Sequence, residues 1–287
     1  MVGSDGAIGA ALVRALRAGG ASVHAGTRRP GLAGPERPPV DLAAMDWPAL
    51  VRASYASAVI AGGVTGIAAC NADPEGTWRI NVDGVARLAE SLAGKGTQVI
   101  LLSTSHVFDG RRRFPGPSDP VSPTDAYGRQ KVEAERRILA LPGGAVLRLA
   151  KVLTPDLPVL ESWRRDLLAG RAVSPFSDRC LAPVSMAQVC EALDRMRRRR
   201  VTGIWQLSAG RDISYAELAT ILADRLGADR SLVRPGPQPD SMAEGTAGPR
   251  FTAFDVSRLS QELGLPVPDP LKVAEEAVEA LVGRPRS

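Results

Sequence analysis

The chain has few of the residues that build disulfide frameworks, metal centres and histidine-based active sites. Three cysteines and two histidines occur among its 287 residues. Cys70, Cys180 and Cys190 are odd in number and lack metal-ligand spacing, which is typical of reduced thiols and argues against a disulfide framework or a zinc site. With only His24 and His106 present, neither a histidine-based triad nor a metal centre is expected.

Long apolar runs are also missing. No run reaches about 18 residues, and the amino terminus has no basic-then-apolar leader, so neither a membrane span nor secretion is predicted. Hydrophobic residues make up 44% of the chain and charged residues 23%, which is ordinary for a globular protein. We therefore expect a cytoplasmic protein without a membrane partner.

The chain has fewer acidic than basic residues, and its formal net charge is +5. The basic run at residues 195–200 is the best support for a nucleic-acid partner. That run closes a helical pattern over residues 185–194, where cations are favoured by the helix dipole. Only three tyrosines occur in the chain and none lies within the run, so no stacking platform for bases is visible. Nucleic-acid binding is not predicted.

The most informative motif is Ser103-Thr104-Ser105, followed by Tyr127 and Lys131. Residues four apart share one face of a helix, so Tyr127 and Lys131 can point at the same substrate atom. An ammonium group near a phenol lowers its pKa, which would make Tyr127 a usable general acid. Thr104 ends an apolar run over residues 98–104 that reads as a buried parallel strand. The alternative is an ordinary surface tyrosine and lysine on a helix.

A glycine-rich turn stands at the amino terminus. Gly3, Gly6 and Gly9 precede a helical run over residues 10–18, a position where backbone amides can approach a pyrophosphate. The next apolar run, residues 22–26, leads to Arg28 and Arg29, where an NAD-preferring site usually has an acidic residue. Two arginines favour the 2′-phosphate of NADP. The alternative is a solvated arginine pair in a loop.

Together these motifs resemble the extended short-chain dehydrogenase/reductases, and within them the dTDP-4-dehydrorhamnose reductase-like sugar-nucleotide reductases. Residues 103–110 (STSHVFDG) are similar to the family's S-T-D-Y-V-F-D-G, and residues 123–135 to its P-x-x-x-Y-G-x-x-K-x-x-x-E. The resemblance covers nearly the whole chain. Further segments in the family's order are residues 61–65, 73–84, 177–183 and 203–208.

The resemblance implies an α/β fold, a Rossmann-like doubly wound parallel sheet with a smaller α-rich carboxyl-terminal substrate subdomain. Residues 1–153 would form the NADP-binding domain. Residues 154–287 would mainly bind the sugar nucleotide, with part returning to the first domain. The implied activity is that of an NAD(P)-dependent oxidoreductase, in which NADPH delivers hydride to a carbonyl carbon. Thr104 would hold the carbonyl and Tyr127 would protonate it, while Lys131 would bind the nicotinamide ribose and lower the pKa of Tyr127.

The resemblance also implies the contacts of an NADP(H) cofactor, with NAD(H) as a possible substitute. The pyrophosphate would lie on the glycine turn, and the adenine and the remaining nucleotide on the loops that follow the next strands. The residues assigned to the cofactor are Gly3, Gly6, Ile8, Gly9, Arg28, Arg29, Asp41, Leu42, Ala61, Gly62, Gly63, Asn81, Tyr127 and Lys131.

The sugar-facing positions depart from the family's pattern. Ser105 and His106 replace the common Asp and Tyr, and residues 67–71 replace a V-D-x-x-E segment, so two carboxylates are missing. Ala150-Lys151 stands in place of a Ser-Trp pair, and Arg179 in place of Gln. The predicted substrate contacts are Ser105, His106, Lys151 and Arg179. We expect reduction of a keto group on a nucleotide-linked (deoxy)sugar other than dTDP-4-dehydrorhamnose.

Two other functions remain open. One is an epimerase or dehydratase on the same scaffold, although such dehydratases usually carry an acid pair after the catalytic threonine. The other is a non-catalytic NADP-binding regulatory subunit like that of methionine adenosyltransferase. Retention of Thr104, Tyr127 and Lys131 weighs against the regulatory subunit. A homodimer is a further possibility.

Local patterns complete the expected organisation. Only Met1 and Val2 precede Gly3, whereas a central strand typically has about five or six residues, so either the start lies upstream or the strand is truncated. Ser214 and Glu217 have the spacing of a capping box. Residues 235–249 are rich in turn formers and are predicted to form a lid over the substrate. Helices are expected over residues 159–169, 214–226, 255–263 and 271–282.

Overall fold

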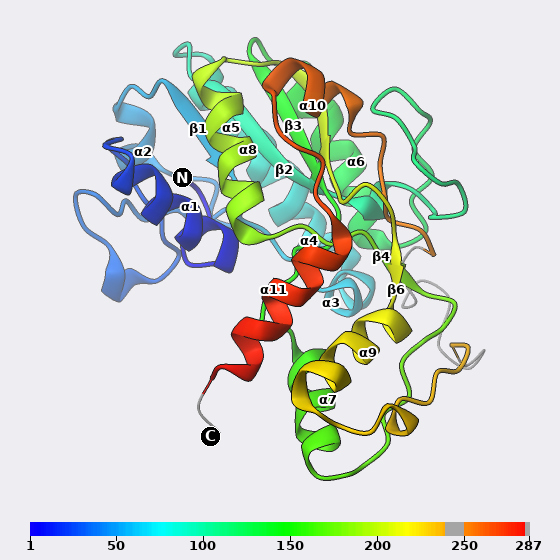
Figure 1. The fold of residues 1–287 in the computed structure, drawn as a ribbon. Coiled ribbons are helices and arrows are strands. Elements are labelled where there is room, and N and C mark those ends of the chain that lie inside the picture. Colours follow the sequence, from blue (N-terminus) through cyan, green and yellow to red (C-terminus); the bar gives the residue numbers. More distant parts are fainter. Residues whose placement is uncertain (239–249, 285–287) are drawn as a thin grey trace. The chain divides into compact units, whose positions relative to one another are not determined.

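The computed structural model describes residues 1–238 and 250–284, which divide into two compact units (Figure 1). The first unit consists of residues 1–108, 117–149 and 189–206. The second consists of residues 109–116, 150–188 and 207–287. The chain therefore passes between the units several times, and each unit is described by itself. The predicted lid lies mostly in residues 239–249, outside the described residues.

The first unit is built on a four-stranded sheet in the order β1-β2-β3-β5. β1 (Ser57–Ile60) pairs in parallel with β2 (Gln98–Thr104), and β2 with β3 (Gly144–Leu149), while β5 (Gly203–Leu207) forms the far edge. Every residue of β2 is buried, as its continuous apolar sequence predicts for a central parallel strand.

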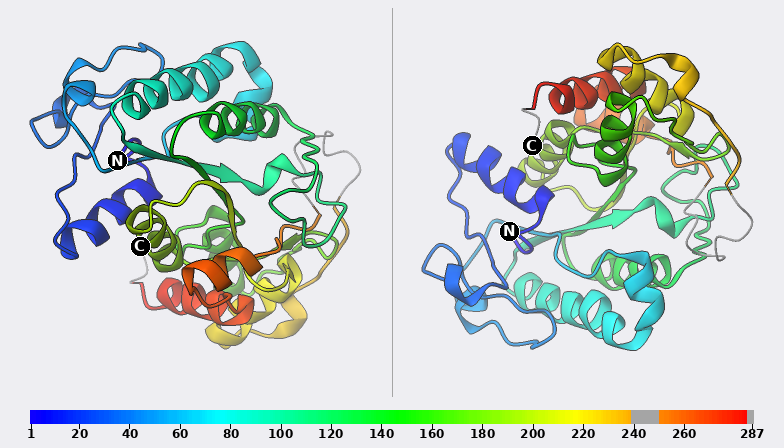
Figure 2. Two further views of the ribbon diagram at one scale, coloured as in Figure 1. Left: turned by 90° about the horizontal axis from the view of Figure 1, so that it is seen from above. Right: turned by 90° about the horizontal axis from the view of Figure 1, so that it is seen from below.

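Helices cover both faces of this sheet (Figure 2). α5 (Val85–Ala93) and α6 (Ala126–Leu139) pack on one face, where both contact β2. α1 (Ala7–Ala18) and α8 (Met186–Arg198) lie on the other. This doubly wound α/β arrangement confirms the predicted fold class.

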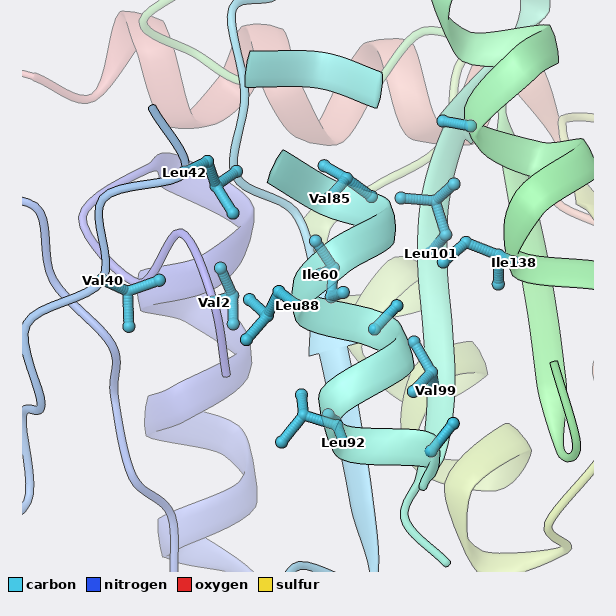
Figure 3. Packing of buried hydrophobic residues seen from close by; sticks show 14 of the residues in the cluster. Val2, Val40, Leu42, Ile60, Val85, Leu88, Leu92, Val99, Leu101 and Ile138 are labelled. Atoms are coloured by element: carbon cyan, nitrogen blue, oxygen red, sulfur yellow. The ribbon is translucent and has the colours of Figure 1, made fainter. Parts of the chain in front are cut away.

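The core beneath α5 and α6 is a continuous apolar cluster (Figure 3). Ile60 of β1 and Leu101 of β2 point into it, together with Leu88 of α5 and Ile138 of α6, and all four side chains are fully buried. Val2 belongs to the same cluster. Because burying such a side chain contributes roughly 1.5–3 kcal/mol, this layer holds α5 and α6 against β1 and β2.

Val2 occupies the place of the central first strand. It forms parallel bridges to both Gly26 and Ile60, and its amide donates to the Val59 carbonyl at 2.9 Å. The amide of Ala61 donates back to the Val2 carbonyl at 3.0 Å. Met1 takes part in the same pairing, since its carbonyl accepts from the Gly26 amide at 2.8 Å just before the glycine turn begins.

A long helical stretch precedes β2 and changes its winding along the way. α3 (Ile67–Ala72) is followed by α4 (Pro74–Trp78), then by a π-helix at Arg79–Gly84, which continues into α5. The π-helical turn contains Asn81, which is buried. Such turns often mark functional positions in helices.

The basic run at residues 195–200 ends α8, as predicted. Arg195 pairs with Glu191, while Arg197 and Arg198 both pair with Asp194, at spacings of three or four residues. These pairs place the arginines on a solvated helix end.

The second unit is mainly helical. It contains a short antiparallel pair, β4 (Cys180–Leu181) and β6 (Ile213–Ser214). The predicted capping box at Ser214 and Glu217 is present and begins α9. α9 contacts both α7 and α11 through a shared apolar core. The helices are α7 (Pro158–Leu168), α9 (Tyr215–Leu226), α10 (Ser257–Leu263) and α11 (Pro270–Val282).

Residues 1–238 and 250–284 contain neither a candidate membrane-spanning helix nor a candidate metal site. None of the helices there has the length and apolar character that a membrane crossing needs. No cluster of histidine, cysteine, aspartate and glutamate side chains there could hold a metal ion. The short helical segments are α2 (Pro48–Arg52) and the 3₁₀ turns Pro30–Leu32, Ser105–Val107 and Arg230–Leu232.

Candidate active site

The glycine turn is closely packed against the loop after β1. Gly3 has φ of +82°, a conformation that other residues rarely adopt, and a Cβ there would lie 2.6 Å from the Gly62 amide nitrogen. A Cβ on Gly9 would lie 2.1 Å from the Gly3 carbonyl oxygen. Gly6 caps α1 without a side chain, so the first-turn amides of this helix stay open toward a ligand.

Two cavities meet at this turn. The first, of about 330 Å³, extends from the glycine turn to Tyr127 and Lys131, and Ile8, Asn81 and Ser103 also line it. The second, of about 440 Å³, is lined by residues from the next two loops. The two share Gly3, Gly6, Ala61, Gly62 and Gly63 as walls, so they form one elongated hollow within the first unit. The loop residues lining only the second cavity include Arg28, Arg29, Asp41 and Leu42.

Arg28 and Arg29 are exposed at the second cavity. Asp5 and Asp41 line the same cavity. The Asp5 carboxylate accepts bonds from the Thr27 hydroxyl at 2.7 Å and from the Arg28 amide at 3.2 Å. Its other oxygen pairs with Arg37 at 2.9 Å. Burial works to raise the pKa of Asp5, but these hydrogen bonds and the Arg37 cation outweigh it and lower the pKa. Asp5 is therefore ionised, and the Arg37 cation balances its charge.

Asn81 fastens the loop that forms the shared wall. Its amide nitrogen donates to the Val64 carbonyl at 2.8 Å and to the Gln130 side chain at 2.7 Å. Its amide oxygen accepts from the Val64 backbone at 2.7 Å. A Cβ on Gly63 would lie 2.6 Å from that same oxygen. Asn81 lines the first cavity, and it also holds residues 61–65 to the helix that carries it.

Thr104 and Tyr127 meet where β2 ends and α6 begins. Asp125 caps α6 by accepting from the Gly128 amide at 2.7 Å, which places Tyr127 in the first turn. Gly128 packs tightly, since a Cβ there would lie 2.2 Å from the His106 carbonyl oxygen. Tyr127 is only partly exposed, and the Thr104 hydroxyl lies close enough to act on its pKa. The structure thus brings the two predicted proton-handling groups together.

The predicted lowering of the tyrosine pKa is wrong for this arrangement. Burial raises the pKa of Tyr127, and so do the neighbouring Cys70 thiol and Asp125 carboxylate, while the nearby Thr104 hydroxyl offsets only part of that effect. Lys131 also lines the first cavity, but its ammonium group donates to the Leu102 carbonyl. Burial lowers the pKa of Lys131 to about 8, against the opposing effect of Glu135. The phenol therefore stays protonated at neutral pH.

A buried ionic network lies behind these groups, and the sequence did not point to it. Arg148 of β3 pairs with Glu135 of α6 at 2.8 Å, and both side chains are nearly inaccessible. Glu135 also accepts from the Ser103 hydroxyl, next to Thr104. Gln206 accepts from Arg148 at 3.3 Å. Because a buried charge without its partner is costly, this network fixes α6 against β2 and β3.

His106 and Ser105 follow Thr104 in a short 3₁₀ turn. The His106 amide donates to the Thr104 hydroxyl oxygen at 3.2 Å, and its ring nitrogen Nδ1 lies 2.7 Å from the Asp125 carboxylate. The His106 and Tyr127 rings meet edge to face, with centroids 6.0 Å apart. Ser105 is buried. Asp125 was not among the predicted site residues, although its position two residues before Tyr127 matches a helix-cap signal.

Lys151 and Arg179 belong to the second unit. The Lys151 side chain is exposed, and its backbone carbonyl accepts from the Val184 amide at 2.9 Å. Arg179 donates to the Gln238 side chain. As substrate contacts these two residues stay predictions.

Comparisons with known proteins give one family for the whole chain. A family model described as RmlD substrate binding domain matches residues 1–282. Methionine adenosyltransferase 2 subunit beta of Danio rerio is 30% identical over 205 residues, which cover 67% of this chain and 62% of the relative. dTDP-4-dehydrorhamnose reductase of Sinorhizobium fredii is 30% identical over 165 residues, covering 54% of this chain and 56% of the relative. Both alignments span less than two thirds of the relative's length.

A solved structure agrees with the fold. The crystal structure of dTDP-4-dehydrorhamnose reductase from Bacillus anthracis, in complex with NADP, has a TM-score of 0.83 and 16% identity. The similarity covers 97% of this chain and 96% of that one. At this level of identity the likeness supports the architecture alone.

Proposed function

The chain belongs to the RmlD substrate binding domain family, and from this premise we propose that it is an oxidoreductase that reduces a keto group on a nucleotide-linked sugar with NADPH. One observation carries the proposal. Tyr127 and Lys131 line one end of an elongated hollow that has the glycine turn at its middle, and Thr104 lies next to Tyr127.

The chain's own residues fit a dinucleotide in this hollow. Gly3 and Gly9 leave room where any Cβ would clash, and the open amides at the start of α1 favour a pyrophosphate beside them. In the second cavity Arg28 and Arg29 would pair with a 2′-phosphate, since Arg37 already balances the charge of Asp5. Asp41 and Leu42 would contact the adenine, and Ile8 and residues 61–63 the phosphates and ribose. We propose residues 1–153 as the main NADP-binding part, with NAD(H) as the weaker cofactor.

The reduction needs a proton as well as a hydride, and NADPH supplies the hydride when bound. Thr104 and Tyr127 would hold the carbonyl oxygen through their hydroxyl groups, and Tyr127 would give its proton to that oxygen. A phenol that stays protonated is the correct starting form for this step. Lys131 would orient the cofactor ribose, and its charge would stabilise the phenolate that remains.

The substrate contacts favour an anionic sugar nucleotide. We assign Ser105 and His106 to the sugar, and Lys151 and Arg179 of the second unit to the nucleotide or the sugar. The two carboxylates common at the sugar-facing positions of similar enzymes are absent, so the substrate should differ from dTDP-4-dehydrorhamnose. Residues 154–287 would mainly bind this substrate. We further propose that the protein is a cytoplasmic homodimer and that it takes part in deoxysugar biosynthesis. Light scattering of the purified protein tests whether it is a dimer.

A regulatory subunit is the second candidate. The similarity to methionine adenosyltransferase 2 subunit beta, equal in identity to that of the reductase, favours it. The retained Thr104, Tyr127 and Lys131 favour turnover instead. An epimerase or dehydratase is less well supported, because Ser105 and His106 stand where the dehydratases usually have an acid pair.

Stopped-flow loss of NADPH absorbance tests the proposal. The protein is mixed with NADPH and a panel of dTDP- and UDP-linked 4-keto sugars, and the products are identified by mass spectrometry and NMR. We expect stoichiometric NADPH oxidation and a new sugar hydroxyl with at least one substrate. Tight NADP binding with no oxidation across the panel would instead support the regulatory subunit. A new product formed without net NADPH consumption would support the epimerase or dehydratase.

A further inference from the structure

His106 and Asp125 form a hydrogen-bonded pair in which each carboxylate oxygen has its own partner. Oδ1 of Asp125 accepts from the Gly128 amide at 2.7 Å, and Oδ2 lies 2.7 Å from Nδ1 of His106. Burial works to raise the pKa of Asp125, but the bonds from His106 and Gly128 outweigh it and lower the pKa. An ionised carboxylate accepts only, so Nδ1 carries a proton and Nε2 is the ring nitrogen left to act.

The exposure of the pair suits exchange with solvent. The His106 side chain is 19% exposed, whereas that of Asp125 is 1% exposed. A carboxylate that is buried, ionised and fixed by a helix cap orients an imidazole whose other edge stays accessible. This is the arrangement that turns a histidine into a general base in unrelated enzymes. A mere helix cap would need only the bond to Gly128.

The pair lies beside the two hydroxyl groups that would hold a substrate carbonyl. The His106 ring is 6.0 Å from the Tyr127 ring, centroid to centroid, and the His106 amide donates to the Thr104 hydroxyl oxygen. A carbon next to that carbonyl is one bond from the carbonyl carbon, so a flanking carbon on the His106 side would come within reach of the imidazole. The other titratable groups acting on this pair and on Tyr127 are the Cys70 thiol and the Arg129 guanidinium. Neither is a usual proton acceptor at neutral pH.

We propose that His106, oriented by Asp125, removes and returns the proton on a carbon next to the keto group, so that the site exchanges this proton as well as reducing the carbonyl. The inference rests on the proposed function, because it uses the same carbonyl-binding groups. The C–H bond breaks and its proton goes to Nε2. Its electron pair forms the C=C bond of an enolate, whose oxygen the Thr104 and Tyr127 hydroxyl groups stabilise. Return of a proton from the imidazolium restores the ketone, and no oxidant is needed.

Deuterium incorporation measures this activity directly. The protein is incubated in D₂O with NADP⁺ and dTDP-4-keto-6-deoxyglucose, without NADPH, and the sugar is analysed by NMR and mass spectrometry. We expect protein-dependent deuterium at one of the two carbons flanking the ketone, faster than in the protein-free control. Reduction is measured in parallel with NADPH.

Three variants locate the base and one serves as control. His106→Gln and His106→Tyr should lower the exchange rate by about 100-fold or more, and reduction by a much smaller factor, so the ratio of exchange to reduction falls. Asp125→Asn keeps a capping oxygen but should lower exchange through the imidazole it orients. His24→Gln is the matched control: His24 bonds Tyr55 at 2.9 Å and lines neither cavity, so both rates should stay within twofold of the parent.

The outcomes separate this inference from the proposed function. Reduction without exchange in the parent protein, or a ratio that does not change in the His106 variants, overturns the role of His106 and leaves the reductase standing. Failure of NADPH oxidation with every keto sugar of the panel overturns the proposed function and this inference together. Loss of thermal stability in a His106 variant is checked by circular dichroism, and the ratio is then compared at a temperature where that variant is folded.

Discussion

Replacing Asn81 with alanine should loosen the wall shared by the two cavities. Asn81 is 3% exposed and makes three strong bonds: two to the Val64 backbone, at 2.7 and 2.8 Å, and one to Gln130, at 2.7 Å. The substitution leaves the buried Gln130 side chain and the partly buried Val64 backbone without these bonds. At about 1 kcal/mol net for each bond, the free energy of unfolding should fall by about 3 kcal/mol. Because domains are stable by roughly 5–15 kcal/mol, the variant should still fold.

Two measurements check this prediction. Urea unfolding gives the loss of stability, and isothermal titration with NADP⁺ should show weaker binding, because residues 61–63 line both cavities. Asn71→Ala is the matched control, since exposed Asn71 accepts a bond from the Ala126 amide at 3.1 Å, and this variant should lose about 1 kcal/mol or less. Equal stability and equal NADP⁺ affinity in Asn81→Ala and the parent would refute the role assigned to Asn81.

Three further predictions concern proton transfer, cofactor choice and pH. Tyr127→Phe should lower turnover by about 100- to 10,000-fold with little change in NADPH affinity, and equal rates in steady-state assays would remove Tyr127 from the mechanism. Arg28→Ala combined with Arg29→Ala should weaken NADPH by about tenfold or more and NADH hardly at all; fluorescence titrations showing parallel weakening would mean that these arginines do not bind the 2′-phosphate. The folded-state pKa of Lys131 is lowered to about 8, below its ordinary value of 10.5, so burial of its charge costs stability below pH 8 and that cost fades as the pH rises toward 10.5. The free energy of unfolding of the parent, measured with urea, should therefore rise relative to that of Lys131→Met between pH 8 and 10.5. A constant difference between the two proteins would contradict the burial of a charged Lys131.

The sheet and the site's location could be predicted because each depends on a local pattern. The continuous apolar run of β2 is typical of a buried parallel strand, and β2 is buried throughout. The spacing of Tyr127 and Lys131 follows from helix geometry, and both side chains do line one cavity. Close packing of Gly3 and Gly9 follows from the glycine spacing in the same way.

Other features depend on contacts between distant residues and were not predictable. The pKa of Tyr127 rises because burial and Asp125 act on it, and neither effect is visible in the spacing to Lys131. The π-helical turn around Asn81 arises where its side chain bonds to Val64, 17 residues away. Val2 pairs with Gly26 and Ile60, two neighbours that lie far along the chain.

Residues 61–63 line both cavities, so a ligand in one cavity also orders the wall that this cavity shares with the other. A dinucleotide that spans both cavities would keep its second half at high effective concentration once the first half is bound. The halves supplied as separate mononucleotides should therefore bind more weakly than the intact molecule, yet each should tighten the other, since ordering the wall once serves both.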